Sequence, residues 1–583
     1  MKNYLIREEI PEKIARELEK YPEILRKLLF YRGIKTEKGA EFFLNPVFEE
    51  NYNPFLMKDM DKAVERILKA IDKKEKIVIY SDYDADGISG AVILYDFFKK
   101  IKYDNFENYI PHRVLEGFGL NEEAVDKFIE SKIDLIITID CGISDIKEAK
   151  KIKKHKIDLI IIDHHLPKIS LTNKEELPYA EAILDIKQKN CEYPEKNLCG
   201  AGVVFKFIQA LILKINTFNF KNFQFDKLNL GWEKWLLDMV AIATISDMVP
   251  LIGENRLFAY YGLKVLKKSP RIGLQKLLSI IKINQKNITE DDISFMISPR
   301  INAASRMENP EDAFNLFITK DENKSLEYAL YLNQLNDKRK VLVALIVKEI
   351  KKYWKKIDPD KKRKVLVAGN PDWKPSLLGL VASSLMNEHC GPVFLWGREK
   401  GKILKGSCRS DGCIDIVNMM RKTSNLFEEY GGHSEAGGFS ISLEKVDLLA
   451  DGLEIVYEKF NVEQNKNKEI MIDAIIKIDD INNDLEKQIS RLAPFGINNL
   501  KPIFLFKEIE IFEIQIFGKK NEHLKINFKN KKEQIISAIG FFIKVEDFSI
   551  KIAKGEKINL LANLEKSFFL GREELRLRIV NIF

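Results

Sequence analysis

The chain has 583 residues, 45% hydrophobic and 31% charged, and this length exceeds what one hydrophobic core organises, so about three domains are expected. The formal net charge is only +7, since 94 cationic side chains face 87 anionic ones, and a polyanionic partner would therefore need a local basic surface. No Cys-x-x-Cys pair and no apolar run near ~20 residues occurs, which excludes a thiolate zinc site and a membrane-spanning helix and favours a cytoplasmic protein.

Residues 1–55 have the charged, helical pattern of an N-terminal extension to the first domain. A first α/β domain is predicted for residues 56–320, because short apolar runs there alternate with segments of helical periodicity. The runs are almost continuously apolar, as in a parallel sheet that is buried on both faces. They cover residues 77–80, 135–139 and 159–162. Such sheets bind ligands beyond the carboxyl ends of their strands.

The second half of the chain predicts three further parts. Apolar residues at helical spacing without Pro or Gly predict a long connecting helix over 321–357. A second, smaller α/β domain is expected over 358–462, where strand-like runs flank a helical segment. Many short β-type runs with little helix then predict an all-β barrel of the OB type over 463–583.

Phenylalanines in two places are candidates for stacking on nucleic-acid bases. The Asn/Phe-rich segment 215–225 interleaves aromatic residues with Lys, although a surface loop whose phenylalanines pack locally is the favoured interpretation. On the barrel strands, where phenylalanines are usually core residues, the candidates are Phe504, Phe506, Phe512 and Phe517.

Three alternating aspartates follow the strand-like run 77–80, namely Asp82, Asp84 and Asp86. Alternate residues of an extended chain project to one side, and three crowded carboxylates are costly unless a cation neutralises them. An EF-type calcium loop also alternates aspartates, but residues 88–91 do not continue that pattern.

The ends of the later runs carry more groups of this kind. Asp140 follows the second run, His164 and His165 follow the third, and Asp247 follows another apolar segment. Because the carboxyl ends of parallel strands meet at one edge of a sheet, these side chains are expected to converge. Oxygen ligands with one or two imidazoles suit Mn²⁺ or Mg²⁺, and the acids suffice for two ions. Two such ions indicate hydrolysis of a phosphoester or phosphoanhydride, and the lack of a Walker lysine argues against ATP.

The triplet Asp163-His164-His165, with the acids before and after it, resembles the motifs of the DHH phosphoesterase superfamily. The resemblance implies a role for each matching position. Asp84 would bind one metal, Asp86 the other, Asp140 would bridge them, and His164 and Asp247 would complete the second site. Asp82 and His165 would be further ligands or would orient ligands and water.

Longer segments resemble the RecJ family of exonucleases over nearly the whole chain. They are 110–120, 298–307, 406–410, 431–438 and 492–499. The resemblance implies an exonuclease of DNA repair and recombination that is specific for single-stranded DNA and releases 5′ mononucleotides from the 5′ end. It also implies single-strand-binding protein and a helicase as partners. The sequence has no strong oligomerisation pattern, and we expect a monomer.

Substrate contacts are expected from side chains within these segments. Arginine forks match phosphate oxygens in a bidentate manner, and hydroxyls or Gly-rich amides add neutral donors. The predicted substrate-binding residues are Arg113, Arg300, Asn302, Arg306, Ser407, Arg409, Ser410, Gly432 and His433. Four positions outside the metal set depart from the family pattern and bear on strand contacts: Ser305, Lys374, Ser384 and Cys408.

Two other functions are compatible with parts of the sequence. A DHH phosphoesterase that acts on short oligoribonucleotides, cyclic dinucleotides or polyphosphate would usually lack the connecting helix and the C-terminal barrel. A non-catalytic single-strand-binding protein would have lost acids from the metal motifs, and none is lost here. Metal-dependent hydrolysis of DNA distinguishes all three.

Overall fold

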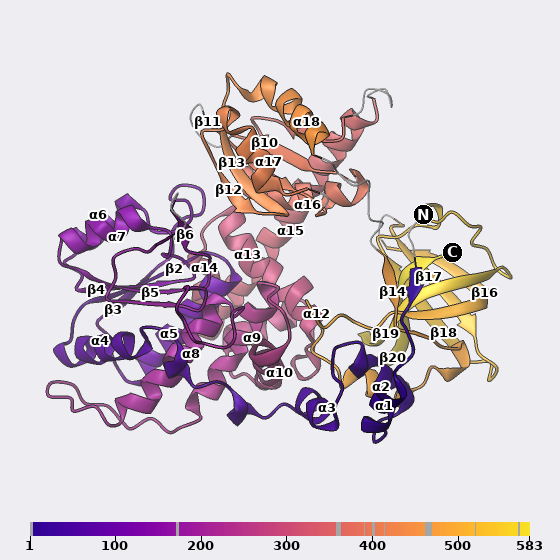
Figure 1. Cartoon of the computed structure of the whole chain (residues 1–583), viewed down its shortest axis with the longest axis horizontal. Helices are drawn as coiled ribbons and strands as arrows, with labels where there is room; N and C mark the ends of the chain where they lie inside the picture. The colour runs from indigo at the N-terminus through magenta and orange to yellow at the C-terminus, as the bar shows by residue number, and fades with distance from the viewer. Residues whose placement is uncertain are drawn as a thin grey trace. The chain divides into compact units, whose positions relative to one another are not determined.

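The computed structural model describes residues 4–170, 174–356, 363–389, 391–398, 403–412, 414–460, 469–518, 521–569 and 572–583. The chain forms two compact units (Figure 1). The larger unit consists of Tyr52–Val249 and Tyr261–Asn465, and the smaller unit of Met1–Asn51, Pro250–Tyr260 and Lys466–Phe583. Among the described residues, no helix has both the length and the apolar character needed to span a membrane.

The larger unit contains a five-stranded parallel sheet in the order β3-β2-β4-β5-β8. Its central strands β2 and β4 are buried at every position, which explains their continuous apolar runs. The strands are β2 (Ile77–Ser81), β3 (Phe106–Tyr109), β4 (Leu135–Ile139), β5 (Asp158–Asp163) and β8 (Ala182–Asp185). The expected parallel α/β fold is confirmed.

Helices cover both faces of this sheet (Figure 1). On one face lie α6 (Glu122–Glu130) and α7 (Ile146–Lys154), and on the other α4 (Met60–Lys73), α5 (Ala85–Lys100) and α8 (Gly200–Ile215). The chain continues through α9 (Leu237–Ser246), α10 (Gly253–Leu266), α11 (Ile272–Ile280), α12 (Glu290–Asp292), α13 (Ser298–Met307) and α14 (Glu311–Ile318), and the short strands β6 (Lys168–Ile169) and β7 (Glu175–Glu176) precede β8.

The predicted connecting helix is α15 (Glu322–Trp354), which has 33 residues. It begins where the Asp321 carboxylate accepts the backbone N–H groups of Asn323 and Lys324, a capping arrangement that satisfies two otherwise unpaired donors. The expected boundaries at 357/358 and 462/463 lie outside the described residues.

After α15 the larger unit forms a second lobe around a mixed sheet in the order β12-β13-β11-β10-β9. Only β9 and β10 are parallel, and the other pairs are antiparallel. Its elements are β9 (Leu366–Gly369), α16 (Pro375–His389), β10 (Val393–Gly397), β11 (Ile403–Arg409), α17 (Ile416–Lys422), β12 (Glu429–His433), β13 (Ala436–Ser442) and α18 (Leu449–Lys459). The expected Gly-rich loop 431–438 is a β-hairpin.

The smaller unit is built on a barrel in the order β15-β16-β17-β18-β20-β19, closed by the pairing of β16 with β19. The expected OB-type barrel is therefore confirmed. Its elements are β15 (Ala474–Ile475), α19 (Asn483–Ser490), β16 (Phe504–Phe517), β17 (His523–Lys529), β18 (Ile535–Phe541), β19 (Lys557–Phe569) and β20 (Arg572–Ile582). Phe504 and Phe506 are fully buried in the core and cannot stack on bases, whereas Phe512 and Phe517 are half-buried.

The first 51 residues differ from the expected extension of the first domain. They pack with the barrel, because Leu18, Leu25 and Leu28 belong to one hydrophobic core with barrel residues. The short strand β1 (Tyr4–Ile6) also pairs in parallel with β14 (Ile470–Ile472). The helices of this segment are α1 (Glu12–Glu17), α2 (Glu23–Phe30) and α3 (Glu37–Leu44).

The Asn/Phe-rich segment packs locally, as favoured. The rings of Phe220, Phe223 and Phe225 contact one another at centroid distances of 5.5 to 6.1 Å. The Asp72 carboxylate accepts the backbone N–H groups of Lys221 and Asn222, which ties the segment to the end of α4.

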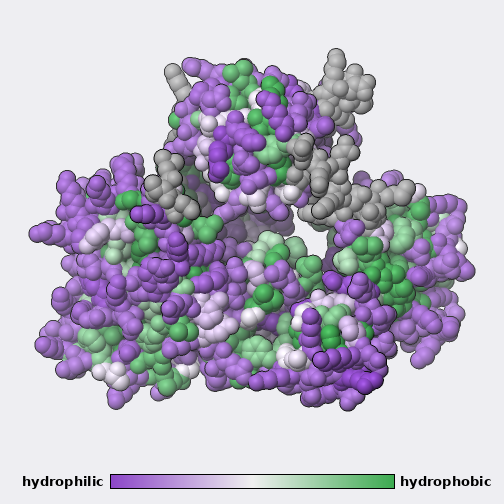
Figure 2. Space-filling model, in the orientation of Figure 1, coloured by the Kyte–Doolittle hydropathy of each residue, from purple (hydrophilic) through white to green (hydrophobic). Residues whose placement is uncertain are grey.

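On the face drawn in Figure 2, most of the surface is hydrophilic.

Candidate metal centre

Acidic side chains meet at the carboxyl ends of the adjacent parallel strands β2, β4 and β5. Asp82 follows β2, Asp140 follows β4, and Asp163 ends β5. Asp84 caps α5, where its carboxylate accepts the N–H groups of Asp86 and Gly87. The register of the three strands is continuous, so their ends lie at one edge of the sheet.

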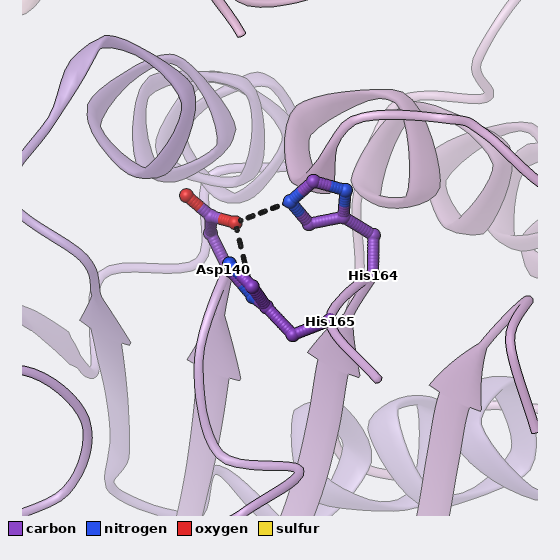
Figure 3. Close-up of side chains that lie close together, drawn as sticks. All are labelled: Asp140, His164 and His165. Atoms are coloured by element: carbon purple, nitrogen blue, oxygen red, sulfur yellow. Dashed lines mark ion pairs between the residues drawn. The ribbon is translucent and has the colours of Figure 1, made fainter. Parts of the chain in front are cut away.

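Figure 3 shows the imidazoles of His164 and His165 directed towards one oxygen of Asp140. The Nε2 atom of His164 lies 3.1 Å from Asp140 Oδ1, 3.8 Å from Asp86 Oδ2 and 3.9 Å from Asp247 Oδ2. The Nδ1 atom of His165 lies 3.9 Å from Asp140 Oδ1. The structure thus brings together the predicted set of Asp82, Asp84, Asp86, Asp140, His164, His165 and Asp247.

Asp163 fixes the backbone on which the two histidines sit. Its carboxylate accepts the backbone N–H groups of Ile143, His164 and His165, and it contacts Nδ1 of His165 at 2.8 Å. Asp163 was predicted only as part of the Asp163-His164-His165 motif, without a role of its own. Its position at the end of a buried strand was the signal that could have found it.

The N-terminus of α8 holds Asp86 in place. The backbone N–H groups of Gly200 and Ala201 donate to the two Asp86 oxygens at 2.6 and 2.7 Å, where the helix dipole favours an anion. A Cβ at Gly200 would lie 2.8 Å from Asp140 Cβ, so only glycine allows this approach. Sequence reasoning did not find Gly200, because its role depends on a segment more than a hundred residues from Asp86.

Burial and mutual repulsion make the carboxylates of this site hard to ionise. Burial, and after it the charge of Asp84, raises the pKa of Asp86 to about 7. Burial, and after it the charge of Asp86, raises the pKa of Asp247 to about 8. The pKa of Asp140 is also raised, chiefly by burial and then by Asp86. Burial and the neighbouring His165 lower the pKa of His164 to about 3, so His164 is neutral. A bound cation would favour the ionised form of these acids, and the neutral imidazole beside them offers a further ligand atom.

The geometry fits a divalent metal ion. Three groups each offer ligand atoms within 4.8 Å of one another: Asp140, His164 and His165; Asp86, His164 and Asp247; and Asp82, Asp84 and Asp140. In the described part of the chain, the buried oxygens Asp82 Oδ1 and Asp140 Oδ1 accept no hydrogen bond. Buried oxygens are normally paired, and both therefore keep lone pairs for a cation. Asp140 belongs to two of the three groups.

A pocket of about 1010 Å³ opens beside the acids between the two lobes of the larger unit. Arg113, whose guanidinium lies 4.8 Å from the Tyr83 ring centroid, is the only predicted substrate arginine that lines it. Phe118, which is exposed and packs against the His165 ring, also lines the pocket. The other lining residues with cationic or aromatic groups were not predicted from the sequence, and they are Tyr83, Lys168, Lys405, Tyr430 and Phe439.

The other predicted substrate residues have different surroundings. Arg300 is buried and donates to Asn333 Oδ1 at 3.0 Å and to the carbonyl of Met296. Its side chain therefore joins α13 to α15. Arg306 donates to the carbonyl of Ser376, which links α13 to the second lobe. Asn302 accepts the N–H of Ala85 at the start of α5.

Arg409 and its neighbours belong to the second lobe. The Arg409 guanidinium donates to the carbonyl of Cys408. Burial lowers the pKa of Arg409; the charge of Cys408 opposes this shift and that of Arg113 adds to it. Ser407 lies close to Gly379 of α16, since a Cβ atom added at Gly379 would be 3.6 Å from the Ser407 Oγ atom. Ser410 is buried, and Gly432 and His433 lie exposed on β12.

The departures from the family pattern lie in two environments. Cys408 belongs to the hydrophobic core of the second lobe, and Ser305 is buried in α13 with its hydroxyl donating to the carbonyl of Asn302. Lys374 and Ser384 are exposed at the start and on the surface of α16. The two buried changes therefore affect packing.

Family models match three parts of the chain. They are the DHH family N-terminal domain over residues 76–244, the DHHA1 domain over 362–459 and the RecJ OB domain over 472–581. The single-stranded-DNA-specific exonuclease RecJ of Bacillus subtilis is 31% identical over 558 residues, which cover 95% of this chain and 67% of that protein. The chain belongs to the RecJ family. The RecJ of Haemophilus influenzae is 28% identical over 99% of both chains.

Solved RecJ structures share this fold. The RecJ of Thermus thermophilus in complex with Mn²⁺ superposes with a TM-score of 0.80 at 23% identity, covering 100% of this chain and 79% of that one. An exonuclease RecJ bound to manganese gives a TM-score of 0.59 at 28% identity over 70% of this chain and 98% of that one. The whole succession of DHH domain, long helix, second lobe and barrel is thus a RecJ architecture.

Proposed function

We propose that this RecJ-family chain hydrolyses single-stranded DNA from the 5′ end and releases 5′ mononucleotides, with two Mn²⁺ or Mg²⁺ ions as cofactors. The observation that carries this proposal is the convergence of Asp86, in the first turn of α5, with Asp140 and His164 at the ends of β4 and β5. Its relatives bear the name single-stranded-DNA-specific exonuclease, which supports the substrate class. Thermus RecJ binds Mn²⁺ and Mg²⁺, which supports the cofactors.

In this proposal, Asp84 would hold one metal, Asp86, His164 and Asp247 would hold the other, and Asp140 would contribute to both sites. When bound, such ions supply Lewis acidity towards phosphoryl oxygens and lower the pKa of water. Asp82, which is buried and directed to the same place, adds negative charge to the site. The protein contributes a set of ligands that is held in position before a metal arrives, since Asp86 and Asp84 are both fixed by helix N-termini.

The remaining residues orient the substrate. Asp163 contacts Nδ1 of His165 at 2.8 Å and so fixes the orientation of this imidazole beside the acids. Arg113 binds backbone phosphate in a bidentate manner from the pocket wall. Phe118 and Tyr430 present rings on which terminal bases stack. Asn302 fixes the first turn of α5, and Arg306 joins α13 to the second lobe.

A polymeric substrate is favoured over a dinucleotide. The 33-residue helix α15 and the closed barrel are both present, and an OB-type barrel is a recurrent platform for single strands. Within this proposal, residues 56–320 form the catalytic domain, and residues 463–583 together with the N-terminal helices form the strand-binding domain. The protein acts as a cytoplasmic monomer with single-strand-binding protein and a helicase as partners.

The decisive experiment uses a linear single strand with a label at the 5′ or the 3′ end. With Mn²⁺, the 5′ label is expected to appear first as a mononucleotide, and EDTA or Asp140→Ala is expected to abolish its release. The matched control is Asp126→Ala, because Asp126 is an exposed acid on α6 that pairs with Lys151 at the surface. Early release of the 3′ label would refute the polarity. Hydrolysis of dinucleotides with long strands left intact would instead indicate a DHH phosphoesterase that acts on small substrates.

A further inference from the structure

A second pocket lies at the far end of α5 from the metal centre. It has a volume of about 1070 Å³ and is lined by the last turns of α5, the segment before α9 and the junction of α14 with α15. Asp86 and Asp96 both belong to α5 and are ten residues apart, which separates the two sites by ~15 Å along the helix axis. The volume is that of pockets that bury a small ligand.

The lining of this pocket carries an excess of positive charge. Six cationic side chains, Lys99, Lys100, Lys102, Arg271, Lys320 and Lys324, face two carboxylates, Asp96 and Asp238, which leaves a net charge of +4. Both carboxylates are already used, since each forms an ion pair with Arg271, at 2.6 and 2.8 Å. The ligand that matches this surface is an anion.

The lysines differ in their pairing. Lys99 and Lys102 pair with the surface acids Asp104 and Asp226. Within the described part of the chain, Lys100, Lys320 and Lys324 form no ion pair with an acid within 4.0 Å, and all three are exposed. Their ammonium groups are therefore available to phosphate oxygens, to which Lys binds as a point charge.

Aromatic rings stand among these lysines. Trp232 and Trp235 line the pocket together with Tyr95, Phe317 and Tyr328. Trp235 is 47% exposed, although tryptophan is among the side chains that gain most from burial. The Nζ atom of Lys100 lies 5.9 Å from the centroid of the Trp232 ring, so a ring and an available cation are adjacent. Rings that alternate with lysines are the arrangement that binds a base and its phosphate.

The floor of the pocket is rigid. Arg271 is almost fully enclosed and donates to Asp238 on α9, to Asp96 on α5 and to the carbonyl of Phe317 on α14. Ser269 also donates to Asp238. This network joins three helices below the rings, and the pocket is therefore formed before any ligand enters.

We propose that this pocket binds a nucleotide unit, with the base against Trp232 and Trp235 and the phosphate among Lys100, Lys320 and Lys324. The nucleotide is either free or part of a DNA strand, because both present the same base and phosphate. The site uses no metal ligand and does not depend on the proposed hydrolysis. The pocket and the metal centre lie at opposite ends of α5, so a nucleotide here contacts the helix that Asp84 caps and that carries Asp86.

The test measures binding to the whole protein in EDTA, which prevents hydrolysis and separates this inference from the proposed activity. The probes are a fluorescent deoxymononucleotide and a fluorescent oligodeoxythymidylate. Lys100→Ala/Lys320→Ala/Lys324→Ala is expected to weaken binding of at least one probe by about tenfold or more, since charge-assisted contacts are lost. The matched control, Lys150→Ala/Lys348→Ala/Lys352→Ala, removes exposed lysines of α7 and α15 outside the pocket and is expected to leave binding unchanged.

The two probes distinguish the source of the nucleotide. A loss confined to the mononucleotide identifies a free nucleotide, and a loss confined to the oligonucleotide identifies a strand. Trp235→Leu tests the rings separately and is expected to weaken the same probe and to reduce the change in tryptophan fluorescence. Equal binding of both probes by the triple-lysine variant and the control, with circular dichroism unchanged, would overturn the inference. So would equal loss in the two triple variants, because it would mark non-specific attraction.

Discussion

The Nε2 atom of His164 lies 3.1 Å from Oδ1 of Asp140, yet that oxygen accepts no hydrogen bond within the described part of the chain. Two polar atoms so close would normally bond in a buried site. Their orientation is instead that of two ligands that point at a common position. The arrangement costs stability in the free protein, and four predictions follow from this and from the neighbouring contacts.

Asp140→Asn is expected to lower exonuclease activity by about a hundredfold to a thousandfold, the range for loss of one preorganised charge-stabilising group. The same change is expected to raise the melting temperature in EDTA, because it removes a buried charge that Asp86 and Asp84 repel. Mononucleotide release and thermal melting measure the two effects. A variant that loses activity and also melts earlier in EDTA would show that Asp140 supports folding more than metal binding.

Mn²⁺ is expected to stabilise the wild-type chain against urea. A ligand present at a hundred times its dissociation constant adds ~2.7 kcal/mol to the free energy of unfolding. The gain is expected to disappear in Asp140→Asn and to persist in Asp126→Ala, whose carboxylate is on the surface. Equal stabilisation of all three proteins would mean that the ion binds elsewhere.

Arg113→Ala and Arg300→Ala are expected to have opposite signatures. Arg113 lines the pocket, so its loss is expected to raise KM several-fold and leave the melting temperature unchanged. Arg300 bonds to Asn333 and the carbonyl of Met296 inside the fold, so its loss is expected to cost ~1–3 kcal/mol of stability. Steady-state kinetics and thermal melting of both variants compare the two effects. If Arg300→Ala changed KM without changing the melting temperature, Arg300 would be a substrate contact.

Asp145, which is not one of the proposed metal ligands, makes the stability of the folded chain depend on pH. Burial raises its pKa to about 6 from an ordinary value of 3.8, although the Leu120 N–H lowers it somewhat. Between these two values the folded state binds more protons at Asp145 than the unfolded state, so the contribution of this group to stability is greatest below pH 4 and is lost as pH rises to about 6. The loss attributable to this group is roughly 3 kcal/mol.

Asp145→Asn keeps an oxygen for the Leu120 N–H and cannot ionise. Its stability relative to wild type is therefore expected to increase from pH 4 to pH 7 in urea unfolding. The outcome that contradicts this is a difference between the two proteins that does not change with pH. Asp126→Asn, which neutralises an exposed acid on α6 that pairs with Lys151 at the surface, serves as the control.

The parallel sheet and the metal centre could be predicted because both follow from local rules. A run such as 135–139 is almost continuously apolar only when both faces are covered, and the residue after it must then lie at the sheet edge. The surroundings of Arg300 could not be predicted, because its partner Asn333 lies on another helix. Pattern also could not separate the core rings Phe504 and Phe506 from the half-buried Phe512 on the same strand.

The packing of the N-terminal helices against the barrel has a consequence for biosynthesis. Arg32 donates to Asn499 across 467 residues of sequence, and Leu18, Leu25 and Leu28 share a core with strands that are translated last. At 5–20 residues per second, these leucines leave the ribosome on the order of half a minute or more before their partners exist. During that time they are exposed and dependent on chaperones. The barrel expressed alone from residue 463 would likewise present an uncovered apolar surface, so soluble expression requires residues 1–51 to be supplied with it.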